Sequence, residues 1–334
     1  LLAREQDMGT LANIQVADAR IVSEALPPSG AAAPNRRMIL ALGLIGGLGL
    51  GVMLAFLKEY YIGGVSSASQ LQNVMQARVP VTVPQVDLPE TGSPADVVIT
   101  APMSPYAETF RKLRATVDMG IDQMLAAADP PRTGGRVILV CSALQAEGKT
   151  TTAIALARTY ALSGARTLLI DADLRKPAVA GRIGAASRIG LLDYLAGNGT
   201  EETKNLQTAL DPLSPLDALT AGERSSVPTD QLINSKAFRA LLGAATRTFD
   251  VVVLDSPPLL PVVDTRYLAR YADAVVQVVR YGTTTQGEVR EAAGQLQEMM
   301  RPEARLYGVL SHEERGNRRY GYYGRYGGYY GQDD

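Results

Sequence analysis

The chain has little of the chemistry that cysteine and histidine supply. Its 334 residues include one cysteine, Cys141, and one histidine, His312. A single cysteine excludes a disulfide within the chain, and one residue of each type excludes a metal site built from clustered histidines and cysteines. The bulk of the chain therefore fits a reducing compartment.

An excess of charge of either sign is also missing. The sequence has 33 Lys and Arg against 34 Asp and Glu, a formal net charge of −1. This balance does not point to nucleic acid or to a strongly charged substrate, so any electrostatic function must be local. The hydrophobic content of 46% is that of ordinary globular protein. Because the chain opens on Leu without a signal-peptide pattern, we expect it to be a fragment of a longer protein.

Charged residues are absent from residues 38–57. As a helix this stretch would span roughly 30 Å, the thickness of the hydrocarbon core of a bilayer. Arginines before it and Lys58 after it are typical of interfacial flanks, so we expect a transmembrane helix rather than a buried core helix. The flanking charges alone would place the residues after this helix outside the cytoplasm. A large domain with a reduced cysteine is better placed in the cytoplasm.

The rest of the chain divides by composition. Before the apolar stretch, Asn13 to Glu24 alternates like an extended strand. After it, residues 58–104 are expected to form a juxtamembrane linker with a short helix over 66–77. From residue 105 to 311, apolar runs alternate with helix-length segments, which predicts an α/β domain with a parallel sheet and helices on both faces. The runs are 136–141, 167–170, 251–254, 274–279 and 306–310.

A phosphate-binding loop is predicted between an apolar strand and a helix that begins near Lys149. Such a loop points backbone N–H groups and the positive end of the helix dipole at one spot. Lys149 would reach the β- and γ-phosphates, and Thr150 would coordinate Mg²⁺. Ala143 stands where the usual pattern has its first glycine. The candidate ATP-binding residues are Ser142, Ala143, Gln145, Ala146, Glu147, Gly148, Lys149, Thr150 and Thr151.

Three aspartates follow two other apolar runs. Asp171 and Asp173 end one run and Asp255 ends another. Ligands of an open parallel sheet bind beyond the carboxyl ends of its strands, so these carboxylates should face the phosphate loop. Such groups can hold Mg²⁺ or accept the proton of an attacking hydroxyl, although strand-end aspartates also cap turns. Asp255 occupies the place of a Walker B carboxylate.

These segments resemble those of the bacterial tyrosine kinases, or BY-kinases, of the Wzc-like polysaccharide co-polymerase group. The family's Walker A′ pattern, three apolar residues then D-x-D-x-R, matches Leu168 to Arg175, and its Walker B pattern, three apolar residues then D-x-P-P, matches Val252 to Pro258. A loop without the first glycine is common in the family. The resemblance covers essentially the whole chain. It implies a P-loop NTPase-like kinase domain, ATP and Mg²⁺ as cofactors, a bacterial inner-membrane location, and residues 1–37 as the end of a periplasmic chain-length-determinant domain.

The resemblance also implies an assembly. A helix with E-x-x-R-x-x-R builds a ring of kinase domains in the family, and Glu108, Arg111 and Arg114 match it. Their spacing places them on one stripe of a helix, which could equally be an ordinary solvated face. The implied partners are further copies of the chain in a ring, an octamer in the family, a cognate protein-tyrosine phosphatase, a polysaccharide polymerase and an outer-membrane exporter.

Residues 312–334 are expected to form a flexible tail because they combine much glycine with no apolar periodicity. The family's autophosphorylated tyrosines lie in this place, so the candidate acceptors are Tyr320, Tyr322, Tyr323, Tyr326, Tyr329 and Tyr330. An extended tail could span on the order of 60 Å, enough for phosphorylation in trans. The alternative of a base-stacking nucleic-acid tail is disfavoured by the preceding transmembrane helix, and we expect no nucleic-acid partner.

The expected mechanism gives Lys149, Asp171, Asp173 and Asp255 catalytic roles. Thr150, Asp173 and Asp255 would surround Mg²⁺, and Asp171 is the candidate base, although the sequence does not decide between Asp171 and Asp173. Two alternatives stay open. One is a P-loop ATPase of the partition or cell-division type, which normally carries a second lysine early in the loop. The other is a membrane-bound scaffold that binds ATP without phosphorylating tyrosine.

Overall fold

The computed structural model describes residues 30, 33–86, 92–127, 134–187, 189–197, 208–222 and 228–313. The strand expected over 13–24 and the six candidate acceptor tyrosines lie outside the described residues. The chain divides into two compact units, Leu1–Phe56 and Leu57–Asp334.

The first unit contains most of helix α2, Arg36–Ile62. The stretch Arg36–Lys58 has a mean hydropathy of 2.3 and none of it is buried. By length and composition it is the one candidate membrane span among the described residues. The apolar stretch expected over 38–57 is therefore a helix, and that helix also takes in the charged flanks on both sides.

The second unit is built on an eight-stranded sheet in the order β1-β8-β7-β2-β6-β3-β5-β4. Neighbouring strands are parallel except for β4 and β5. All five expected strands are present, whereas β1, β4 and β5 were not expected. The strands are β1 Arg78–Pro84, β2 Arg136–Ser142, β3 Thr167–Asp171, β4 Ala209–Leu210, β5 Asp217–Leu219, β6 Val251–Asp255, β7 Ala274–Arg280 and β8 Arg305–Glu313.

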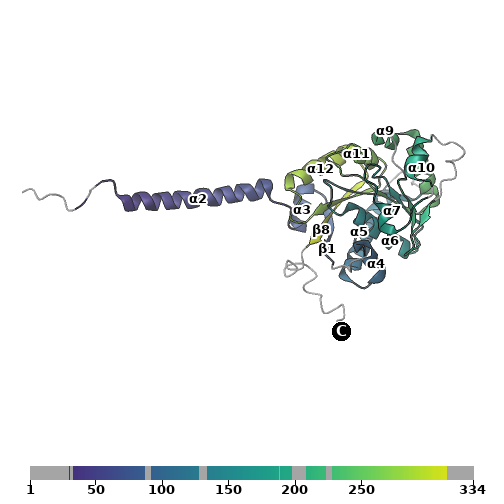
Figure 1. Cartoon of the computed structure of the whole chain (residues 1–334), viewed down its shortest axis with the longest axis horizontal. Helices are drawn as coiled ribbons and strands as arrows, with labels where there is room; N and C mark the ends of the chain where they lie inside the picture. The colour runs from purple at the N-terminus through teal and green to yellow at the C-terminus, as the bar shows by residue number, and fades with distance from the viewer. Residues whose placement is uncertain are drawn as a thin grey trace, which may run out of the picture. The chain divides into compact units, whose positions relative to one another are not determined.

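Helices cover both faces of this sheet, as the sequence predicts (Figure 1). The residues of β2 show why. Ile138 and Val140 pack in the core beneath α5 and α6, while Val137 and Leu139 pack in the core beneath α10, α11 and α12. Every second side chain of a strand points to the same face, so a strand buried on both faces is apolar throughout. The helices are α3 Ala68–Met75, α4 Val97–Thr100, α5 Pro105–Ala126, α6 Lys149–Leu162, α7 Val179–Ile183, α8 Leu191–Ala196, α9 Thr229–Ile233, α10 Lys236–Thr248, α11 Asp264–Ala269 and α12 Gln286–Met299, with a 3₁₀ turn η1 at Pro94–Asp96.

The boundary expected at residue 105 is too late. Strand β1 pairs in parallel with β8, with Val81 opposite Val309. Helix α3 buries Leu71 and Met75 in a core cluster shared with α12. The segment expected to be a linker therefore supplies an edge strand and a covering helix, because its apolar residues complete the core of the sheet.

Candidate functional site

The candidate site lies at the carboxyl ends of three central strands, β2, β3 and β6. Asp171 at the end of β3 is opposite Asp255 at the end of β6, and the phosphate loop follows β2. A cavity of about 310 Å³ opens there, within the size range of ligand sites. It is lined by Gln145, Ala146, Gly148, Lys149, Thr150, Asp173, Arg175, Lys176, Ala178, Arg182, Pro257, Pro258, Pro261 and Val262.

The phosphate loop ends in a helix start that has free donors. Gly148 adopts φ +96°, a left-handed conformation that favours glycine, and α6 then begins without a side-chain cap. The first N–H groups of a helix have no partner within the helix, so they remain available to an anion in line with the helix dipole. This local geometry is that of a phosphate site.

Five of the nine predicted ATP-binding residues line the cavity: Gln145, Ala146, Gly148, Lys149 and Thr150. The side chains of Ser142, Ala143 and Glu147 are buried below the loop instead. Thr151 is half-buried, and its hydroxyl accepts a hydrogen bond from Arg182 Nη1 at 2.5 Å.

Glu147 shapes the loop from inside. One carboxylate oxygen accepts the N–H of Leu144 at 2.5 Å, and the other accepts the hydroxyl of Thr284. Burial raises the pKa of Glu147, while these hydrogen bonds oppose the rise. We conclude that Glu147 braces the phosphate loop and that its side chain does not face the cavity.

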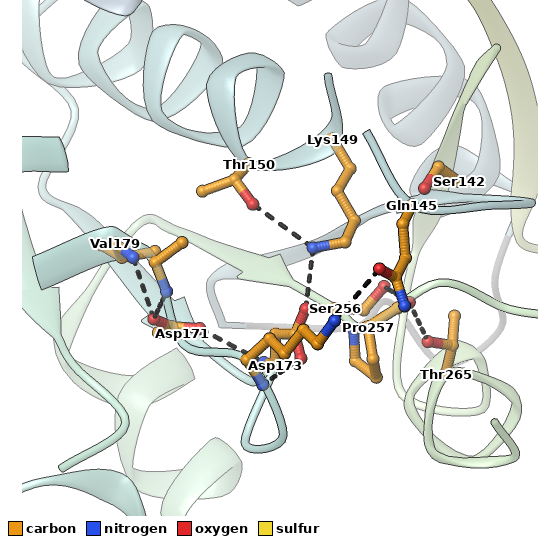
Figure 2. Close-up of polar contacts among 12 residues, drawn as sticks. Ser142, Gln145, Lys149, Thr150, Asp171, Asp173, Val179, Ser256, Pro257 and Thr265 are labelled. Carbon is orange, nitrogen blue, oxygen red and sulfur yellow. Dashed lines mark hydrogen bonds and ion pairs between the residues drawn. The ribbon is translucent and has the colours of Figure 1, made fainter. Parts of the chain in front are cut away.

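Lys149 points into the cavity toward two predicted site residues (Figure 2). Its Nζ donates to Asp173 Oδ2 at 2.8 Å and to Thr150 Oγ1 at 3.3 Å. Burial disfavours the charged amine, but the carboxylates of Asp255 and Asp173 outweigh it and raise the pKa of Lys149. Lys149 is thus a cation surrounded by carboxylates, and its amine can move from Asp173 to phosphate oxygens when a nucleotide binds.

Asp171 lies behind the cavity wall. It is fully buried, and its Oδ2 accepts the N–H groups of Ala178 at 3.1 Å and Val179 at 3.0 Å, where α7 begins. Burial, with the nearby charge of Asp255, raises the pKa of Asp171 to about 7. A carboxyl with such a pKa is suited to proton transfer near neutral pH. Asp173, by contrast, lines the cavity directly.

Asp255 is the most isolated of the carboxylates. It is fully buried, and within the described part of the chain neither of its oxygens has a hydrogen-bond partner. Burial raises the pKa of Asp255 to about 6, against the charge of Lys149 and the nearby hydroxyl of Thr150. A buried carboxylate without partners is costly unless a cation completes it, so Asp255 fits a divalent metal.

The oxygen donors near Asp255 suit Mg²⁺ better than a metal that takes all of its ligands from protein side chains. The described residues contain no cluster of three or more His, Cys, Asp or Glu side chains that could hold a metal. Mg²⁺ commonly uses one or two carboxylates and completes its shell with water and substrate phosphates. Asp255, Asp173 and the Thr150 hydroxyl provide such a set.

The three residues of the expected assembly motif lie on α5 and make contacts within their own chain. Arg111 forms an ion pair with Glu108 at 2.7 Å and donates to the Pro102 carbonyl at 2.6 Å. Arg114 donates to the Thr159 carbonyl at 3.3 Å. Both arginines border a second cavity of about 440 Å³ between α4, α5 and α6. Their role in assembly stays a prediction.

Sequence reasoning gave no role to three other cations that line the cavity: Arg175, Lys176 and Arg182. Arg175 appears in the aspartate motif, but its pairing with buried Asp264 at 3.1 Å depends on the start of α11. Arg182 lies on α7, beyond any recognised motif. No pattern in the sequence places α7 against the phosphate loop.

Comparison with known proteins adds independent findings. Residues 1–60 match the family model described as a G-rich domain on tyrosine kinases, and residues 135–303 match an AAA domain. The succinoglycan biosynthesis transport protein ExoP of Rhizobium meliloti is 32% identical over 87% of this chain and 39% of its own length. The chain thus spans about two fifths of that relative. The tyrosine-protein kinase YwqD of Bacillus subtilis is 31% identical over 68% of this chain and 90% of its own length.

Solved structures agree on the fold. The kinase domain of the Escherichia coli tyrosine kinase ETK superposes with a TM-score of 0.64 at 24% identity, covering 78% of this chain and 98% of that domain. The BceF tyrosine kinase domain gives a TM-score of 0.61 at 23% identity, covering 75% and 99%. With the AAA-domain match over half of the sequence and the match to nearly all of YwqD, these findings show that the chain belongs to the bacterial tyrosine kinase family.

Proposed function

We propose that this chain is the ATP-dependent kinase part of a membrane-anchored protein-tyrosine autokinase that phosphorylates tyrosines at its own C-terminus. The observation that carries the proposal is that Lys149 and Asp173 line one cavity beside a helix start without a side-chain cap, with the buried carboxylate of Asp255 near Lys149. Family membership selects a tyrosine hydroxyl as the acceptor.

The reaction breaks the bond between the γ-phosphorus of ATP and the bridging oxygen to the β-phosphate, and forms a bond from that phosphorus to a tyrosine oxygen. ADP leaves, and the hydroxyl proton passes to a carboxylate. Lys149 and the N–H groups at the start of α6 bind the phosphates. Thr150, Asp173 and Asp255 would hold Mg²⁺, which neutralises charge on the β- and γ-oxygens when bound.

Two aspartates are candidates for the base. Proton affinity favours Asp171, and access to the cavity favours Asp173. Asp171 has a pKa of about 7 but is enclosed by backbone donors, whereas Asp173 faces the cavity but is paired with Lys149. We propose Asp171 as the base. Lys149 would turn from Asp173 to the phosphates when nucleotide binds, and Asp173 would then bind Mg²⁺.

The wider setting is proposed from the relatives. Helix α2 would anchor the chain in a bacterial inner membrane with the second unit in the cytoplasm and the N-terminal segment in the periplasm. A ring of copies joined through Glu108, Arg111 and Arg114 would let one subunit phosphorylate its neighbour. The similarity to ExoP, a succinoglycan biosynthesis transport protein, supports a role in exopolysaccharide production and export, where a phosphatase, a polymerase and an exporter would be partners.

Incubation of the purified full chain with ATP and Mg²⁺, with ADP and phosphotyrosine measured in parallel, tests the proposal. A kinase gives phosphotyrosine, and Lys149→Met removes it. ATP binding or hydrolysis without any phosphotyrosine would support the ATPase scaffold instead and refute the kinase.

A further inference from the structure

Four cationic side chains line the candidate nucleotide cavity, and three of them are bonded to carboxylate or amide oxygens. The three pairs are Lys149 with Asp173 at 2.8 Å, Arg175 with Asp264 at 3.1 Å, and Lys176 with Gln145 at 3.2 Å. The fourth cation is Arg182. Among the described residues its side chain has no carboxylate partner, and its Nη1 instead donates to the Thr151 hydroxyl at 2.5 Å. A guanidinium bonded to one neutral oxygen keeps most of its donors for an anion.

The position of Thr151, the partner of Arg182, indicates that this anion is a phosphate group. Thr151 lies in the first turn of α6, directly after Thr150, where the uncapped N–H groups and the helix dipole already favour phosphate. The hydrogen bond to Thr151 and the place of Arg182 in the cavity lining therefore put its charge beside the phosphate loop.

Helix α7 holds Arg182 in this position. The buried carboxylate of Asp171 accepts the N–H groups of Ala178 and Val179 and so fixes the start of α7 to the end of β3. Arg182 follows in the last turn, and Gly184 ends the helix with φ +71°. The arginine is thus carried by an element tied to β3, and its side chain is exposed.

We propose that Arg182 leaves the Thr151 hydroxyl when nucleotide binds, contacts the phosphate groups, and stabilises the negative charge that spreads over the transferred phosphoryl group. The inference rests on the proposed kinase function and adds a catalytic residue to it. Arginine suits the task because its planar fork can bind two phosphate oxygens at once and stays charged. Phosphoryl transfer depends on such positioning and charge stabilisation more than on covalent chemistry by the protein.

The test compares Arg182→Ala and Arg182→Lys with Arg239→Ala, a control that removes an exposed arginine of α10 outside the cavity. In the full chain with Mg²⁺, titration calorimetry gives the Kd for ATP and for ADP, and single-turnover assays give the rate of phosphotyrosine formation. We expect Arg182→Ala to weaken ATP binding and to slow transfer at saturating ATP, each by about 10- to 100-fold. Arg182→Lys should restore part of the affinity and less of the rate, and Arg239→Ala should match the wild type.

Unchanged ATP affinity and transfer rate in Arg182→Ala would overturn the proposal. So would equal losses in both Arg182 variants accompanied by a lower melting temperature, since these would mark a structural role. If the wild type binds ATP more tightly than Arg182→Ala but neither forms phosphotyrosine, the nucleotide contact stands and the kinase function fails. The two ideas are therefore separable.

Discussion

At the scale of single residues, Asp255 shows how the site sets stability against function. Its carboxylate is buried without a partner in the described structure, and burial raises its pKa from 3.8 to about 6. Such a group costs free energy in the nucleotide-free protein and is compensated when a cation arrives. The sequence identified Asp255 from its place at a strand end, but not its isolation, which depends on how the surrounding loops close.

Asp255→Asn should therefore stabilise the nucleotide-free chain and abolish its response to Mg²⁺ and ATP. Each pKa unit corresponds to about 1.4 kcal/mol, so we expect the free energy of unfolding at neutral pH to rise by about 1–3 kcal/mol. Thermal unfolding with and without Mg·ATP measures both effects. Asp250→Asn is the control: this exposed residue pairs with Arg166 outside the site, and its variant should keep the full ligand-induced shift.

The raised pKa values of Asp171 and Asp255 predict opposite pH trends for stability and for ligand binding. In the folded chain these carboxyls hold protons up to about pH 7 and about pH 6. Unfolded aspartates lose their protons near pH 4, so the folded state binds more protons between those values. The contribution of both groups to stability consequently falls as pH rises from about 4 to 7.

Binding of Mg·ATP requires the ionised carboxylates, so its affinity should increase over the upper part of that range, from about pH 5.5 to 7.5. Calorimetric titration across this range tests the trend. An affinity that is flat, or that decreases with pH, would contradict the raised pKa values.

At the scale of elements, the phosphate loop is held by the segment between β7 and α12. Thr284, the residue before the cap of α12, donates its hydroxyl to the buried Glu147 of the loop. Thr284 also accepts the N–H of Val65 through its carbonyl, at 2.9 Å. Thr284 thus bonds both to the segment that follows α2, at Val65, and to the phosphate loop, at Glu147.

Thr284→Val keeps the shape of the side chain but removes the hydroxyl that donates to one carboxylate oxygen of Glu147. Removing a hydrogen bond to a buried charged group costs about 1–3 kcal/mol, so we expect ATP affinity to fall by about tenfold as the loop loosens. Thr283→Val is a matched control, because Thr283 is exposed and its hydroxyl donates to the Tyr281 carbonyl rather than to Glu147. Equal ATP affinities for the two variants would show that Glu147 does not brace the loop.

The sequence predicted elements where local pattern and tertiary burial agree. Strands buried on both faces, such as β6, are continuous apolar runs, and the parallel arrangement then brings their terminal aspartates together. Strands β4 and β5 span two and three residues and leave no such run. The position of α7, and with it Arg182, follows from backbone hydrogen bonds to Asp171 that no residue pattern encodes.

At the scale of the whole molecule, the C-terminal end of β8 lies beside the nucleotide site. Strand β8 pairs with both β7 and the edge strand β1, and near its end Ser311 donates to the carbonyl of Glu147 at 2.7 Å. His312 lies beside Gly148 and adopts φ +61°. The segment that carries the candidate acceptor tyrosines therefore starts next to the phosphate loop. Fully extended, the chain from 311 to 330 could span on the order of 60 Å.

Mapping of phosphotyrosine by mass spectrometry tests the account most directly. The purified full chain, its Lys149→Met variant and its Asp255→Asn variant are each incubated with Mg·ATP, and the peptides that cover residues 320–330 are analysed. We expect phosphate on these tyrosines in the wild type and its loss in both variants. Tail phosphorylation that persists in Lys149→Met, or a wild type that binds ATP yet carries no phosphotyrosine there, would contradict it.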